Sequence, residues 1–91
     1  MKVLITSPCS ASTIIQYGIK SWPIWECKPS KFQWNYDEKE ICLIIEGQAK
    51  ISTKNGDIYL IKAGDLVEFP AGLYCEWEVT KNIKKHYRIG S

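Results

Sequence analysis

The stretch GDLVEFPAGLYCEWEV (residues 64–79) predicts a short strand, a tight turn and a second strand. Pro70 and Gly72 mark the turn, because proline presets φ at a central turn position and glycine tolerates positive φ. The flanking segments DLVEF and YCEWEV are rich in the β-branched and aromatic residues that favour strands. Cys75, three residues past the turn, raises the question of a reactive centre.

The same β pattern extends in both directions from this hairpin. Phe32, Trp34 and Tyr36 alternate with polar neighbours, as in a half-buried strand. Asn55-Gly56 is a strong hairpin signal. With WPIWEC, EICLIIEG, QAKIST, DIYLI and KKHYRI, the count reaches eight or nine short strands. Their edges and apolar faces need covering, so residues 22–89 predict an all-β, jelly-roll barrel.

Residues 1–20 predict an N-terminal strand followed by at most one short helix. Residues 1–6 have the composition of an edge strand, and Ser7-Pro8 resembles a helix start. Residues 10–19 could then form the helix, with Gly18 near its end. Ninety-one residues are too few for a second core, so residues 1–91 form one domain.

Composition and charge exclude several classes of function. The net charge of +2 is too small to indicate nucleic-acid binding. We interpret the basic cluster Lys81, Lys84, Lys85 and Arg88, around His86, as a solvated strand face. The longest apolar run, ICLII, cannot span a membrane, and the N-terminal residues lack the apolar region of a signal peptide. We therefore expect a cytoplasmic protein with no nucleic-acid or membrane partner.

The four cysteines, Cys9, Cys27, Cys42 and Cys75, include no Cys-x-x-Cys pair. This spacing disfavours a zinc ribbon or a thioredoxin-like site. In a cytoplasmic chain they are most simply free thiols that pack as small hydrophobic groups.

Two spaced motifs resemble those of a cupin. The second cupin motif consists of a glycine, five residues, Pro-x-Gly, two residues and a histidine. Residues 64–75 follow this spacing with Gly64, Pro70 and Gly72, but Cys75 stands at the histidine position. Glu40, six residues and Gly47 match the end of the first motif. The chain therefore resembles a small single-domain cupin, similar to the (S)-ureidoglycine aminohydrolase-type cupin domain.

The resemblance also implies where a usual cupin metal site would lie. The family's His-x-His pair would fall at Trp34 and Tyr36, or one residue earlier at Gln33 and Asn35. The chain has a single histidine, His86, so the usual three-histidine site is absent.

The resemblance implies that Glu40 and Cys75 face the barrel interior beside Trp34 and Tyr36. Strand alternation adds Cys42 and Trp77 to the same faces. The predicted pocket residues are Trp34, Tyr36, Glu40, Cys42, Cys75 and Trp77. Cys75 could be a packing residue or a nucleophile, and Glu40 a paired carboxylate or a general acid or base.

These observations predict a small cupin with a degenerate metal site that binds a small molecule in its barrel, without a cofactor. The first alternative is a metal-dependent enzyme of the ureidoglycine aminohydrolase-like type. It would hold a divalent metal (zinc, manganese, nickel or iron) through Glu40, Cys75 and His86. The second alternative is an interaction module that forms a homodimer through an edge strand. Whether the protein is an enzyme stays open.

Overall fold

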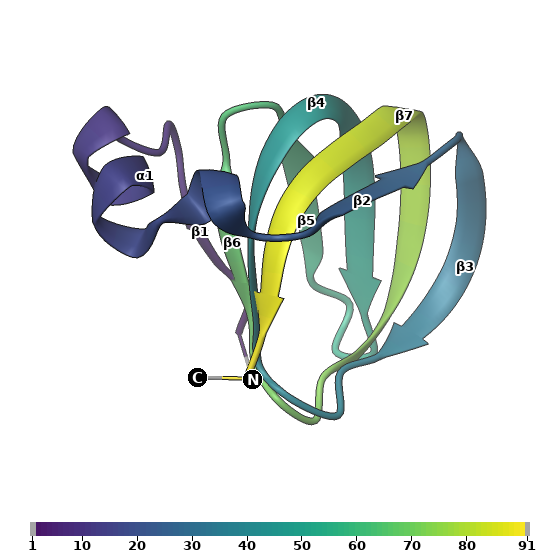
Figure 1. Ribbon diagram of the computed structural model, residues 1–91. Helices are drawn as coiled ribbons and strands as arrows, with labels where there is room; N and C mark the ends of the chain where they lie inside the picture. The colour runs from purple at the N-terminus through teal and green to yellow at the C-terminus, as the bar shows by residue number, and fades with distance from the viewer. Residues whose placement is uncertain (1, 91) are drawn as a thin grey trace.

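A computed structural model describes residues 2–90 as an antiparallel sheet rolled into a barrel, with one short helix outside it (Figure 1). The strands follow the order β1-β6-β4-β7-β2, while β3 also pairs with β7 and β5 with β4. This confirms the predicted all-β, jelly-roll-like class. The elements are β1 (Leu4–Thr6), α1 (Ala11–Tyr17), the 3-10 turn η1 (Ile19–Ser21), β2 (Ile24–Cys27), β3 (Ser30–Asn35), β4 (Glu40–Thr53), β5 (Ile58–Lys62), β6 (Leu66–Phe69) and β7 (Tyr74–Ile89).

Two long, bent strands form the centre of the sheet. EICLIIEG and QAKIST, expected as separate strands, run together as β4, and YCEWEV and KKHYRI run together as β7. The register between β4 and β7 shifts three times, between Ile44 and Ala49. Such irregularities bend a strand pair without ending it. Residues 2–90 therefore contain seven strands instead of eight or nine.

Gly47 lies at the bend of β4 and explains the glycine of the first motif. Its φ of +92° belongs to the region that L side chains rarely adopt. A Cβ at this position would collide with the backbone of Asn82 and Ile83 on β7. The two long strands can therefore cross closely here only if residue 47 is glycine.

The two faces of β4 are buried against different partners. The inner face contributes Cys42 and Ile44 to the barrel core, together with Phe69 and Trp77 from β6 and β7. The outer face is covered by the segment that includes η1, where Ile19 and Trp22 pack against Ile41 and Leu43. Burial on both sides explains why the run is apolar from Ile41 to Ile44, whereas Ile45 at its end is exposed.

The N-terminal segment differs from the expectation at its helix start. Ser10, not Ser7, caps α1: its hydroxyl accepts a hydrogen bond from the Thr13 backbone N–H at 3.1 Å. The helix ends before Gly18, which has a left-handed φ of 62°. The peptide bond between Ser7 and Pro8 is cis, and Pro8 precedes the helix. β1 lies at the end of the sheet beside β6, as expected of an edge strand, and Met1 and Ser91 lie outside the described residues.

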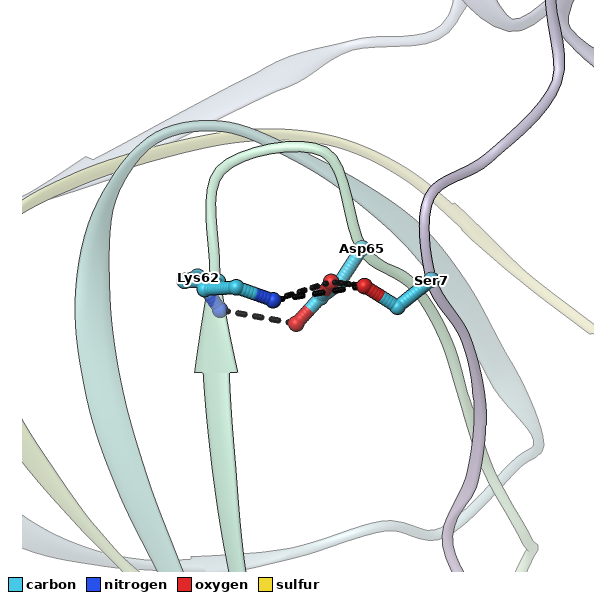
Figure 2. A network of polar contacts seen from close by, with 3 residues as sticks. All are labelled: Ser7, Lys62 and Asp65. Carbon is cyan, nitrogen blue, oxygen red and sulfur yellow. Dashed lines mark hydrogen bonds and ion pairs between the residues drawn. The ribbon is translucent and has the colours of Figure 1, made fainter.

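Asp65 ties the turn between β5 and β6 to this N-terminal segment (Figure 2). Its side chain is almost fully buried and accepts a hydrogen bond from the Ser7 hydroxyl. Lys62 donates twice to the same carboxylate, from its backbone N–H at 3.0 Å and from Nζ at 3.3 Å. These partners satisfy the buried charge. The acidic residue after Gly64 thus stabilises the fold and lies outside the cavity described below.

We expect Gly47→Ala to lower the free energy of unfolding by at least about 3 kcal/mol, because it adds a backbone collision to an unfavourable φ. Gly64→Ala is the matched control, since Gly64 has a φ of +96° but no atom within 4 Å of the point where a Cβ would lie. That variant should lose only about 1–2 kcal/mol. Urea denaturation measures both, and equal losses would contradict a special role for the β4 bend.

Candidate functional site

A cavity of about 240 Å³ lies between the inner faces of β2, β3, β4 and β7. At its mouth, the side chains of Trp34 and Ile89 are about half exposed. Farther in, Glu40 and Lys85 are only 6% and 5% exposed. Its lining is mostly aromatic and consists of Trp25, Phe32, Trp34, Tyr36, Glu40, Trp77, Lys85, Tyr87 and Ile89.

Lys85 and Glu40 form a buried ion pair at this cavity. Lys85 Nζ donates a hydrogen bond to Glu40 Oε2 at 2.6 Å. The antiparallel register pairs Glu40 with Ile89 and Ile44 with Lys85, so both charged side chains lie on the inner face of the β4–β7 ladder. The sheet therefore places together two charges that are 45 residues apart in the chain.

Aromatic rings surround the ammonium group of Lys85. Nζ lies 4.9 Å from the ring centroids of both Trp25 and Trp77, and 6.0 Å from that of Phe69. Ring faces attract a cation, and this attraction adds to the ion pair in offsetting the loss of water around the charge. Lys85 is thus fixed by Glu40 and by two indole faces.

Tyr36 brings a third polar group to the cavity. Its hydroxyl oxygen accepts a hydrogen bond from Trp77 Nε1 at 3.1 Å. Burial, followed by the negative charge of Glu40, raises the pKa of Tyr36 far above its ordinary value. The phenol is therefore protonated at neutral pH and can donate a hydrogen bond.

Cys42 and Cys75 lie in the barrel core and do not belong to the cavity lining. Burial raises the pKa of Cys75 to about 11 and that of Cys42 to about 12, although the positive charge of Lys85 opposes both shifts. A thiolate is the reactive form of cysteine, and neither residue forms it at neutral pH. This supports the packing interpretation of Cys75 over the nucleophile.

His86 lies on the opposite face of β7 from Lys85. It pairs with Leu43 of the outer cluster, and its Nδ1 is 3.0 Å from the Trp22 carbonyl oxygen. The structure therefore does not bring His86 together with Glu40 and Cys75. Within residues 2–90, no group of three histidine, cysteine or acidic residues has the arrangement of a metal site. The residues present do not fit the usual cupin metal, because an ammonium group occupies the place beside Glu40.

Of the six predicted pocket residues, Trp34, Tyr36, Glu40 and Trp77 line the cavity. The interpretation of Lys85 as part of a solvated face was wrong, because Lys85 is buried. The burial of Lys85 could have been predicted from the alternation of Ile83, Lys85 and Tyr87, because two apolar residues flank this lysine on the same strand face. Sequence reasoning also missed four lining residues, Trp25, Phe32, Tyr87 and Ile89.

The rolled sheet and the cavity inside it are those of a small cupin. Residues 16–87 match the model of the EutQ-like cupin domain, and the chain belongs to this family. It is similar to a DUF861 family protein from Thermotoga maritima, with 40% identity over 97% of this chain and 99% of that chain, and a TM-score of 0.94.

Two EutQ proteins share the fold. The EutQ protein from Salmonella typhimurium is 22% identical over 74% of this chain and 54% of its own length, with a TM-score of 0.67. The EutQ protein from Clostridium difficile is 24% identical over 74% of this chain and 52% of its own, with a TM-score of 0.68. The chain thus spans about half of each protein. No curated protein matches it. In the described part of the chain, no helix has the length and apolar character needed to cross a membrane.

We expect Glu40→Met and Lys85→Met each to lower the free energy of unfolding by about 3–5 kcal/mol, because each leaves an uncompensated buried charge. The double variant should lose much less than the sum of the two. Urea denaturation of the four proteins gives the coupling energy. The exposed pair Lys31–Glu76, whose Nζ and Oε1 are 3.8 Å apart, serves as a control. Its coupling should not exceed about 1 kcal/mol, and an equally small coupling for Glu40 and Lys85 would contradict a buried pair.

We expect a thiol reagent at pH 8 to modify Cys9 and Cys27 in the folded protein, while Cys42 and Cys75 react only after unfolding. The same pKa shifts predict that stability falls as the pH rises above about 9. Unfolded thiols lose their protons there, whereas the folded ones keep theirs until about pH 11 and 12. Mass spectrometry of the modified protein checks which thiols react, and denaturation at pH 8 and 10 checks the loss of stability. Rapid modification of Cys75 in the native state would contradict this account.

Proposed function

We propose that the protein binds a small molecule in the cavity between β2, β3, β4 and β7. The proposal rests on one observation: the two residues of a buried ion pair, Glu40 and Lys85, line a cavity whose other walls are mostly aromatic. Ligand sites are typically concave and largely apolar, with a few polar groups that orient the ligand. Glu40, Lys85 and the Tyr36 hydroxyl provide those groups.

The energetics of the pair support a role beyond packing. Replacing a buried ion pair with apolar residues of similar volume is often neutral or stabilising. An apolar pair would therefore suffice for stability alone. We infer that Glu40 and Lys85 serve recognition, since they line the cavity that the aromatic residues of the inner face surround.

The aromatic walls set the kind of contact that the cavity offers. Phe32 and Trp77 are stacked with centroids 6.1 Å apart, and Trp25 meets both rings edge-on. These rings hold one another, so the wall is formed before a ligand arrives. A preformed site loses little entropy on binding.

The metal-dependent alternative of the ureidoglycine aminohydrolase-like type has less support. It needs Glu40, Cys75 and His86 around one ion, whereas His86 faces the outer cluster near Trp22.

We expect neutral one- and two-ring fragments to shift the indole NMR signals of Trp25, Trp34 and Trp77, which line the cavity. The signal of Trp22 should stay unchanged, because Trp22 packs in the outer cluster. Trp34→Ala should weaken binding about fivefold through loss of an aromatic contact. Tyr17→Ala is the control, since Tyr17 is a similarly exposed aromatic residue on α1. A fragment library that shifts none of the three cavity indoles would refute the proposal.

A further inference from the structure

The ion pair presents a hydrogen-bond donor beside a hydrogen-bond acceptor. The Lys85 ammonium has three N–H groups, and one of them binds Glu40 Oε2. Glu40 Oε1 accepts no hydrogen bond within residues 2–90, and it is not among the polar atoms sealed from solvent. The two side chains line the cavity together. A ligand in the cavity therefore meets the Lys85 ammonium next to a Glu40 oxygen that accepts no other hydrogen bond.

The charge of the site is balanced before a ligand enters. Among residues 2–90, Glu40 and Lys85 are the only charged residues of the lining, and they neutralise each other at 2.6 Å. An anion would approach the Glu40 carboxylate, and a cation would approach the Lys85 ammonium. Either would be repelled by the like charge at short range or would displace one partner of a buried pair, which costs several kcal/mol. A neutral ligand avoids this cost.

The walls and the size of the cavity favour a flat ligand. Trp25, Phe32 and Trp77 offer aromatic surfaces, which contact planar π systems well. The volume of about 240 Å³ is below the roughly 300–1,000 Å³ of sites for drug-sized ligands. One or two fused rings are therefore the upper limit.

We propose that the ligand is a neutral, planar cyclic amide of one or two rings. Its carbonyl oxygen accepts a hydrogen bond from Lys85, and its adjacent N–H donates to Glu40 Oε1. A cyclic amide carries both groups on one edge, as the donor and acceptor of the pair require. This inference rests on the proposed binding function and adds the chemical class of the ligand.

Calorimetric titration of the wild-type protein with three probes tests the class. 2-Quinolone has the complete amide edge, N-methyl-2-quinolone lacks the N–H, and quinoline-2-carboxylate is an anion of similar shape. We expect 2-quinolone to bind roughly tenfold or more tightly than either analogue. N-methyl-2-quinolone cannot donate the hydrogen bond to Glu40, and quinoline-2-carboxylate brings an unbalanced negative charge into the site.

The double variant Glu40→Met/Lys85→Met removes the polar edge and leaves no unpaired charge. In this variant, 2-quinolone and N-methyl-2-quinolone should bind with affinities within about threefold of each other, since no anchor distinguishes them. The matched control Lys31→Met/Glu76→Met removes an exposed pair on the β3–β7 ladder and should keep the wild-type preference. If the first double variant does not fold, the wild-type series decides alone.

The outcomes separate this inference from the binding function. Tighter binding of the carboxylate, or equal binding of the three probes, overturns the cyclic amide and leaves a small-molecule site. Failure of all three probes to bind, while other ring fragments shift the cavity indoles, also overturns only the ligand class. No binding of any probe or fragment overturns both.

Discussion

The Lys85–Glu40 ion pair limits how β4 and β7 can pair inside the barrel. Two charges buried in the apolar interior of the barrel cost too much free energy unless they neutralise each other at close range. That requires β4 and β7 to keep one register from Glu40 to Ile44, which pair with Ile89 to Lys85, so that both charged side chains lie on the inner face. The bend at Gly47 belongs to the same requirement, because it lets the two long strands stay paired while the sheet rolls.

The ion pair also determines what chemistry the interior can support. In the cupin resemblance, Glu40 is a metal-ligand position, yet here its carboxylate binds an ammonium group. The two nearby thiols are kept protonated by burial. The polar groups left in the cavity are the Lys85 donor, the Glu40 acceptor and the Tyr36 phenol, and the other walls are mostly aromatic. This arrangement suits the recognition of a ligand by its shape and by the polar groups on one of its edges.

The relatives of this chain support the fold more firmly than any activity. The Thermotoga maritima protein matches over nearly the whole length of both chains, so the barrel and its N-terminal cover form one shared unit. The two EutQ proteins match through about half of their own lengths and at identities that show the fold alone. The residues of the cavity are therefore the basis for inferring a function.

The sequence by itself determined the all-β class and the turns, because glycine, proline and strand alternation act over a few residues. The inward direction of Glu40 followed only from the resemblance to a cupin. The sequence also marked Trp34, Tyr36 and Trp77 as candidates for the pocket. Only the tertiary structure decided that Lys85 points inward and His86 outward. Alternation separates the two faces of a strand without saying which is enclosed. YCEWEV and KKHYRI were expected as separate strands, so the inward face of Cys75 and Trp77 could not be extended to Lys85 until the structure joined them as β7. The partner of Glu40 lies 45 residues away, and only the closed sheet brings the two together.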